Sequence, residues 1–444
     1  MIGSSSKDVT PAGTQTPPSG GRRQALAAAA RRYALAALGP LTISAAHFAA
    51  SILFLKLMAP AVFGLFAFVL VVVPFWLSIS VALLGAPLAT TRQRHDGAED
   101  WRELPTLLKA NLLFSLAATL FVAATMAASG ADPAAAALLG LYGGVMCVRW
   151  FARWLSYATH HPLRAVLSDV AYGMLLVAGL LALLLLHVTS MTSAALVLAI
   201  SAAAGLAVFG RAFLVQQIRA VAQGTLAAYR PIWRDLTQWA LLGVVTTELS
   251  ANAHAYLVTL LSGPKSFALI AAGSLFMRPV SLCLTALPDR ERPLLVRTLM
   301  AGDHAAADRQ VREFRGAAAA IWLLTLALSA AALAWFPSLI LKPDYDRGQV
   351  VVVVILWAAI MAVRSLRTPE AVLLQAAREF KPLASASVWA SVVSLGLTAG
   401  LLLAFGPVAS LLGILAGDAV MTERIFALVR RWKRTQRWRL APAV

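Results

Sequence analysis

Residues 57–78, LMAPAVFGLFAFVLVVVPFWLS, form an almost wholly apolar run. Its length suits the hydrocarbon core of a bilayer, which takes about 20 helical residues to cross. Similar runs recur along the 444-residue chain, which is 60% hydrophobic and only 13% charged, with a mean hydropathy of +0.76. The alternating short strands typical of an outer-membrane barrel are absent from the sequence. We therefore expect an all-α, polytopic membrane protein.

Twelve transmembrane helices are expected, separated by short or moderate connections. They cover 35–57, 62–87, 106–128, 134–157, 167–187, 192–214, 237–261, 265–288, 316–336, 349–374, 384–405 and 408–429. Nearly all Lys and Arg residues of the connections fall on one side of this arrangement, and the chain carries a net charge of +18. Because cytoplasmic loops carry the excess of positive charge, both termini are expected in the cytoplasm. The concentration of Lys and Arg in cytoplasmic loops also explains the net positive charge, so we do not expect nucleic acid as a partner.

The opening segment has a counterpart half a chain later, residues 261–282, LSGPKSFALIAAGSLFMRPVSL. Pro60 and Phe63 of the first segment match Pro264 and Phe267 of the second at the same offset. The two segments are offset by six expected spans, so both would run in the same direction through the membrane. This pattern predicts a parallel repeat about an axis along the membrane normal.

A polar break at 215–236 divides the six spans before it from the six after it. The predicted organisation is a disordered, basic, cytoplasmic N-terminus (1–32), an N-lobe (33–230), a C-lobe (231–430) and a basic cytoplasmic tail (431–444). Within the break, QQIRAVAQGTLAAYRPIWRDL (216–236) is expected to lie on the inner surface as an amphipathic linker. The tail RRWKRTQRWRL (430–440) mixes cations with Trp, which is typical of contact with anionic lipid head groups.

Five arginines lie inside the expected spans, where each costs about 2.5–3.5 kcal/mol at a helix centre. They are Arg149, Arg153, Arg278, Arg364 and Arg367. Arg149, Arg278 and Arg364 each lie about 20–22 Å below the start of a span that runs in the same direction. Arg149 and Arg153 share one helix face, as do Arg364 and Arg367, because of their spacing.

Two interpretations of these arginines remain open. In the first, they are neutralised by carboxylates within the membrane; the candidate partners are Asp169, Glu248, Glu370 and Asp418. Glu370 is three residues from Arg367, and Glu248 has a depth similar to that of Arg278. In the second, which we favour, Arg149, Arg278 and Arg364 line one water-filled cavity, supported by Arg153 and Arg367. A guanidinium group binds two phosphate oxygens at once, so such a cavity would suit an anionic substrate. Arg153 could instead snorkel to the inner surface.

Three further polar residues, His47, Asn252 and His254, occupy equivalent positions in the first and seventh spans. They could line the same cavity or form hydrogen bonds between helices. Cys147 and Cys283 lie far apart in apolar runs, so we expect packing roles and no metal site. The sequence has no GxxxxGK[ST] loop and no enzyme signature, so a transporter is expected rather than an enzyme, with no cofactor.

Several segments together resemble the multidrug/oligosaccharidyl-lipid/polysaccharide (MOP) exporter superfamily, and within it the Wzx-type polysaccharide flippases. They are LKLMAPAVFGLFAFVLVV (55–72), ALPDRERPLLVRTLMAGDHAAADRQVREF (286–314), VLLQAAREFKPL (372–383) and GPVASLLGILAGDAVMTERIFALVRR (406–431). The resemblance covers about 33–431 and depends on the order and spacing of these segments.

The resemblance implies two six-helix lobes in a V shape around a cationic cavity. It implies alternating-access translocation of a polyprenyl-pyrophosphate-linked oligosaccharide from the inner to the outer leaflet of the bacterial inner membrane, for exopolysaccharide or O-antigen synthesis. Membrane lipids, a polysaccharide polymerase and glycosyltransferases are the implied partners. The coupling ion, H⁺ or Na⁺, stays open, with Glu248 and Asp418 as candidate carriers.

Two alternatives are a cation-coupled multidrug exporter and a membrane-embedded scaffold or enzyme of glycan assembly. The exporter is disfavoured because those relatives often carry an acid in the first span. Here His47 is the titratable residue of that span's core.

Overall fold

The computed structural model describes residues 19–91, 103–336 and 341–440, and every regular element in these ranges is a helix. The elements are α1 (Ser19–Leu57), α2 (Pro60–Ser80), η1 (Val81–Gly85), α3 (Ala86–Thr91), α4 (Leu104–Ala128), α5 (Pro133–Ala158), α6 (Pro162–Leu185), α7 (Met191–Ala207), α8 (Gly210–Gln223), η2 (Leu226–Ala228), α9 (Tyr229–Ile232), η3 (Trp233–Thr237), α10 (Gln238–Ser262), α11 (Pro264–Phe276), α12 (Arg278–Met300), α13 (His304–Trp335), α15 (Arg347–Ala376), α16 (Phe380–Phe405) and α17 (Ser410–Leu440).

The all-α membrane fold is confirmed, and most helices fall where the apolar runs predict spans. The span predicted over 192–214 is an exception, because α7 ends at Ala207 and the chain turns by 97° into α8. Among the described helices, eight are long and apolar enough to cross a bilayer, and two bent pairs, α7–α8 and α11–α12, raise the number to ten. The remaining two predicted spans correspond to α10 and α17, which carry Glu248 and Asp418 within their apolar parts. Of the N-terminus predicted to be disordered, residues 1–18 lie outside the described residues, and the backbone is helical from Ser19 onward.

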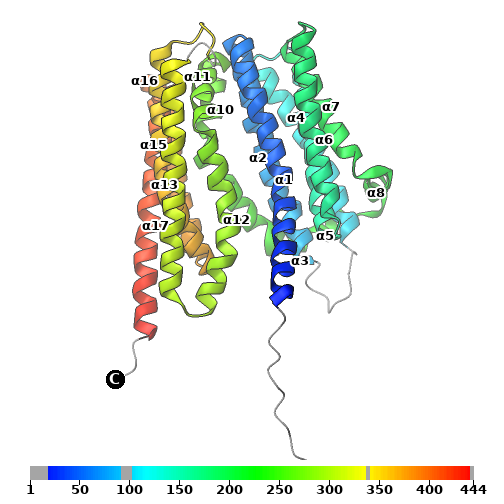
Figure 1. The fold of residues 1–444 in the computed structure, drawn as a ribbon. Helices are drawn as coiled ribbons and strands as arrows, with labels where there is room; N and C mark the ends of the chain where they lie inside the picture. The colour runs from blue at the N-terminus through cyan, green and yellow to red at the C-terminus, as the bar shows by residue number, and fades with distance from the viewer. Residues whose placement is uncertain (1–18, 92–102, 337–340, 441–444) are drawn as a thin grey trace, which may run out of the picture.

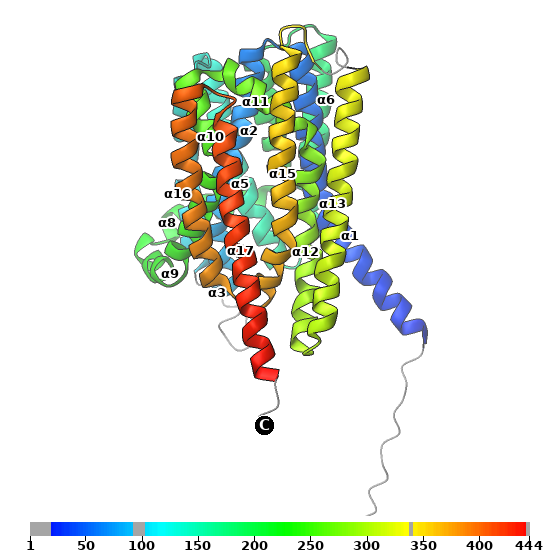
Figure 2. The same cartoon turned by 90° about the vertical axis from the view of Figure 1, so that its left-hand side faces the viewer.

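Two groups of helices stand side by side (Figure 1). In the first group, α1 packs on α6, α4 on α5, and α5 on α7; in the second, α16 packs on α17, and α13 on both α12 and α15. Helix α1 begins and α17 ends at the same end of the bundle, which we call the terminal end (Figures 1 and 2). The opposite end, where α2 and α11 begin, is called the distal end.

The two groups meet mainly where α2 packs against α11 and α10. Near the distal end the contact is between backbones, because a Cβ atom added to Gly64 would collide with the carbonyl of Pro264. Farther along, the ring of Phe68 meets the rings of Phe267 and Tyr256 edge to face, with centroids 6.0 and 5.4 Å away. Aromatic pairs in this arrangement stabilise a contact by about 0.5–1.5 kcal/mol beyond simple burial. The distal end is therefore closed along this seam.

Toward the terminal end the groups diverge on the side of α1 and α12. The chain bends by 61° between α11 and α12, at Met277, and Pro279 is the second residue of α12. A proline cannot donate the backbone hydrogen bond that would continue a straight helix, so it favours a bend here. Helix α1 contacts α11 and α12 only sparsely, and Figure 1 shows α1 and α12 separating toward the terminal end.

The connection between the groups is tied to the first group. The hydroxyl of Tyr229, on α9, donates a hydrogen bond of 2.6 Å to the carbonyl of Leu83 in η1. It also lies 3.3 Å from the hydroxyl of Thr237 at the end of η3. Both η1 and η3 are π-helical segments, a geometry found frequently at functional sites.

Candidate functional site

The first cluster of intramembrane charge joins α5 to α6. Nη2 of Arg149 lies 2.5 Å from Oδ1 of Asp169, and Nη2 of Arg153 lies 2.9 Å from Oδ2 of the same carboxylate. Nε of Arg149 also donates to the hydroxyl of Ser168, at 2.9 Å. The guanidinium of Arg149 lies 4.9 Å from the ring centroid of Tyr172. One carboxylate therefore holds two guanidinium groups inside the first group of helices.

This cluster is buried among the residues that the structure describes. The side chains of Arg149 and Asp169 have 0% exposure, and that of Arg153 has 7%. Gly205 of α7 makes room for the arginine, since a Cβ atom there would lie 2.7 Å from Nε of Arg149. The prediction that Arg149 lines a water-filled cavity is wrong in this conformation, because α6 and α7 enclose it. Arg153 does not snorkel either; it stacks over Trp150, at 4.2 Å from the ring centroid.

The second cluster joins α15 to α17 and does reach a cavity. Nε of Arg364 lies 2.7 Å from Oδ2 of Asp418, and Nη1 of Arg367 lies 2.6 Å from Oδ1. The two arginine side chains are 20% and 21% exposed, against 5% for the aspartate. All three line a pocket of about 380 Å³ between α10, α15, α16 and α17. Two guanidinium groups face one carboxylate, so the three charges leave the pocket wall net positive.

Glu370 pairs with a different cation from the one the spacing suggests. Its Oε1 accepts a hydrogen bond from Nη2 of Arg315, on α13, rather than from Arg367. Arg367 is drawn instead to Asp418 on α17. Arg315 falls outside the predicted spans, yet α13 begins at His304 and carries it well inside a long helix. The sequence therefore did not point to this pair.

Arg278 is the first residue of α12, directly after the bend. It has no ion pair or hydrogen-bond partner among the residues that the structure describes, and its Nε atom is buried. The candidate pair with Glu248 does not form. Glu248 accepts instead from the hydroxyl of Ser78, on α2, at 2.9 Å and from Nδ2 of Asn252 at 2.8 Å. The carboxylate of Glu248 thus joins the two groups of helices without a cation.

The two histidines named from the sequence lie in different surroundings. Nε2 of His47 lies 2.6 Å from the hydroxyl of Tyr172. His254 is buried against the rings of Trp357 and Phe267.

The hydroxyls of Tyr172 and Tyr142 lie 3.1 Å apart, which extends the His47 contact into a short polar chain through α1, α6 and α5. No pattern in the sequence pointed to this chain.

The five intramembrane arginines are therefore distributed over three places rather than one. Arg149 and Arg153 are sealed within the first group, Arg278 lies at the bend of α12, and Arg364 and Arg367 line the pocket of the second group. Neither Arg149 nor Arg278 is among the residues that line that pocket. Among these five arginines, the described structure offers a positively charged pocket and one unpartnered guanidinium.

No protein-family model matches the sequence, and no curated protein matches it. Solved structures do match over most of the chain. An inward-facing multidrug resistance MATE family transporter of the MOP superfamily is 12% identical, covers 92% of this chain and 96% of its own, and gives a TM-score of 0.64. The lipid II flippase MurJ, in an inward closed conformation, is 9% identical, covers 89% and 87%, and gives 0.68.

Two further matches give lower TM-scores. A MOP superfamily transporter from Pyrococcus furiosus, described as having a binding pocket of reversed polarity, is 13% identical, covers 91% and 95%, and gives a TM-score of 0.53. An outward-facing MATE structure, 12% identical and covering 91% and 95%, gives 0.52.

Proposed function

We propose that this chain, which has the fold of the MOP superfamily of membrane transporters, is a flippase for a polyprenyl-pyrophosphate-linked oligosaccharide. It would carry the head group from the inner to the outer leaflet of the bacterial inner membrane, for exopolysaccharide or O-antigen synthesis. The polyprenyl tail stays in the lipid while the charged head group passes between the two groups of helices.

The observation that carries this proposal is the excess of positive charge on the wall of the pocket in the second group. Arg364 and Arg367 share Asp418, so one guanidinium charge is left uncompensated there. Guanidinium groups bind phosphate in a fork geometry, and charge-assisted hydrogen bonds of this kind are roughly twice as strong as neutral ones. A pocket of about 380 Å³ lies within the range of small-molecule sites, about 300–1,000 Å³. It could receive a pyrophosphate and an adjoining sugar.

Arg278 supplies the second element of the proposal. A half-buried guanidinium without a counterion is costly within a membrane, and ionisable groups there mark substrate or ion paths. Because Arg278 lies at the bend of α12, movement of α12 would displace it directly. We assign it to transient contact with the pyrophosphate as the head group passes.

Alternating access would require the α2–α11 seam to part and the terminal end to close. The seam holds the distal end shut, so loading takes place from the terminal end, which the charge bias of the loops assigns to the cytoplasm. Glu248 is the proposed carrier of the coupling ion, H⁺ or Na⁺, because it joins α2 to α10 through hydrogen bonds alone. Loss or gain of a charge there would alter the contact between the groups.

The same carboxylate favours a second candidate function, cation-coupled export of drugs. An acidic group without a basic partner among the described residues could bind a cationic compound or its counter-transported ion. The two candidates differ in the sign of the cargo. The net positive pocket favours an anionic cargo and therefore the flippase.

The test uses proteoliposomes with a lipid-linked oligosaccharide in both leaflets and a membrane-impermeant periodate that oxidises only exposed sugars. Arg364→Gln/Arg367→Gln should reduce the rate of transbilayer movement at least tenfold. The matched control, Arg309→Gln/Arg312→Gln, removes two exposed charges from α13 at the terminal end and should leave the rate unchanged.

Equal rates for the pocket variant and the wild type would refute the flippase. Export of cationic drugs by the wild type, improved in the pocket variant, would favour the exporter. Absence of any transport together with formation of a glycan product would favour an enzyme of glycan assembly.

A further inference from the structure

Helix α8 leaves the membrane-spanning direction abruptly. It follows α7 at an angle of 97°, after a turn at Val208 and Phe209. Helix α7 has 17 residues and therefore rises about 25 Å from the distal end, close to the about 30 Å thickness of the hydrocarbon core. Helix α8 thus runs along the boundary of the bilayer on the terminal side, where Figures 1 and 2 show it projecting from the bundle.

One face of α8 is fixed to the bundle. Phe213, Gln217 and Ala220 are buried, and the amide of Gln217 donates to the carbonyl of Leu108 and accepts from Asn111 of α4. At the end of the helix, Nζ of Lys109 donates to the carbonyl of Gly224 at 3.0 Å. The orientation of α8 about its own axis is therefore set by packing, and its other two faces have defined directions.

The second face of α8 is an exposed apolar stripe. Leu214, Ile218 and Val221 are 36%, 69% and 45% exposed, and their spacing places them in one row along the helix. A row of large apolar side chains at the boundary of a bilayer is suited to contact with acyl chains.

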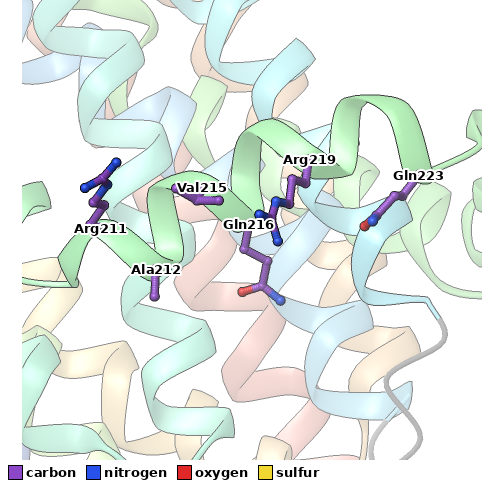
Figure 3. Close-up of a pocket in the computed structure, with 6 residues that line it drawn as sticks. All are labelled: Arg211, Ala212, Val215, Gln216, Arg219 and Gln223. Carbon is purple, nitrogen blue, oxygen red and sulfur yellow. The ribbon is translucent and has the colours of Figure 1, made fainter.

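The third face carries positive charge. Arg211, Gln216, Arg219 and Gln223, with Ala212 and Val215, line a shallow pocket of about 490 Å³ (Figure 3). Both arginines are exposed, and neither has an ion-pair or hydrogen-bond partner within the described ranges. No Asp or Glu occurs in the sequence between Asp169 and Asp235, so no acidic residue neutralises this stretch from within it.

We propose that α8 is a binding site for the head group of an anionic phospholipid in the leaflet at the terminal end. Arg211 and Arg219 bind the phosphate oxygens, Gln216 and Gln223 supply further hydrogen bonds, and the apolar stripe holds the first part of the acyl chains. The three faces fit this occupant together: one seats the helix on α4, one meets hydrocarbon, and one meets the charged layer above it. Soluble phosphate would bind the arginines but would not contact the apolar stripe.

The site would have a mechanical role that does not depend on the identity of the cargo. Helix α8 leads through η2 into α9 and η3, which connect the first group of helices to the second. A bound lipid would hold this connection at the level of the head groups while the groups move. The site is thus separate from the pocket of Arg364 and Arg367.

The test measures lipid retained by the full-length protein in detergent, by native mass spectrometry, after exposure to equal amounts of phosphatidylglycerol and phosphatidylcholine. Wild type should retain phosphatidylglycerol preferentially, and Arg211→Gln/Arg219→Gln should lower that preference about tenfold. A tenfold change is expected because each basic residue near an anionic surface contributes to the attraction of anionic lipid, and this variant removes two. Arg211→Lys/Arg219→Lys, which keeps the charge, should retain most of the preference, and Ile218→Ser/Val221→Ser should weaken retention of both lipids.

Two controls make the result decisive. Arg309→Gln/Arg312→Gln removes the same charge from α13, and an equal loss of preference in that variant would overturn the site as one of general electrostatics. Glycerol 3-phosphate at millimolar concentration should not displace the lipid; displacement would assign the arginines to a soluble phosphate and refute a lipid site. If the Gln variant does not fold, full retention of both lipids by Ile218→Ser/Val221→Ser would equally refute it.

Discussion

Nη2 of Arg149 lies 2.5 Å from Oδ1 of Asp169, and neither side chain has any surface exposed to solvent or lipid. Asp169→Asn would leave two buried guanidinium groups without a counterion. Breaking a buried pair in this way costs about 3–5 kcal/mol, so the variant should unfold at a markedly lower temperature in detergent. Arg149→Met/Arg153→Met/Asp169→Leu, which removes all three charges of the cluster, should recover most of the loss. A thermal midpoint unchanged in Asp169→Asn would contradict the pairing.

The pocket of the second group should respond in opposite directions to removal of its two kinds of charge. Asp418→Asn raises the net positive charge of the wall and should tighten binding of a pyrophosphate-bearing lipid, while lowering stability. Arg364→Gln should weaken the same binding about tenfold or more, since hydrogen bonds to charged groups contribute about 1.5–3 kcal/mol. Microscale thermophoresis of the purified variants would compare the affinities. Weaker binding in both variants would mean that the pocket is a structural ion pair rather than an anion site.

The close approach of α2 and α11 makes Gly64 sensitive to the smallest enlargement. In Gly64→Ala the added methyl group meets the carbonyl of Pro264, so the helices must separate at the distal end. We expect a longer distance between spin labels at residues 189 and 262, measured by electron double resonance after Cys147 and Cys283 are replaced by Ser.

Gly396→Ala is the matched control for this variant, because nothing lies within contact distance of its added methyl group. It should leave the distance unchanged and raise stability by up to about 1 kcal/mol. Identical distances in Gly64→Ala and wild type would show that the seam does not depend on this contact.

Glu248→Gln keeps the shape of the side chain and loses its charge. If Glu248 carries the coupling ion, transport by the variant should become insensitive to an imposed proton or sodium gradient while movement down the lipid gradient continues. Asn252→Ala, which removes one hydrogen bond and leaves the carboxylate, serves as the comparison. A full gradient response in Glu248→Gln would transfer the coupling role to another group.

Asp132, exposed in the turn before α5, gives a pH dependence outside the membrane. The backbone amide of Ala135 donates to its carboxylate at 2.9 Å and lowers its pKa from the usual 3.8. A lowered folded-state pKa means that this stabilisation is complete above pH 3.8 and is lost as pH falls through the lower value. Asp132→Asn should therefore show a smaller loss of stability below pH 4 than wild type. If Asp132→Asn and wild type lose thermal stability to the same extent below pH 4, this contribution is ruled out.

The fold was predictable because the lengths of the apolar runs and the charges of the loops can be read from the sequence, and most helices lie where those patterns place them. The partners of the arginines were not predictable for a different reason. Counting residues from the start of a span gives depth but not the direction in which a side chain points around the helix axis. Arg149 and Arg364 have similar depth, yet one faces Gly205 and Asp169 inside its own group and the other faces a pocket.

The length of α13 was the second feature that the sequence did not predict. The sequence places Arg315 just before a span at 316–336, but α13 begins a full three turns earlier, at His304, and brings Arg315 beside Glu370. The first part of α13 lies outside the hydrocarbon and carries positive charges. Hydropathy does not predict a helix in such a charged segment. Side-chain partners between helices depend on such extensions, and a one-dimensional pattern does not contain them.

The hydrogen bond from the hydroxyl of Tyr229 to the carbonyl of Leu83 fixes the linker to η1. Any motion that separates the second group of helices from η1 must first stretch or break this hydrogen bond. The chain between Tyr229 and α10 is too brief to provide slack. Tyr229→Phe would keep the ring and remove the hydrogen bond. The hydroxyl oxygen would therefore limit the amplitude of the motion between the two groups of helices rather than the affinity for cargo.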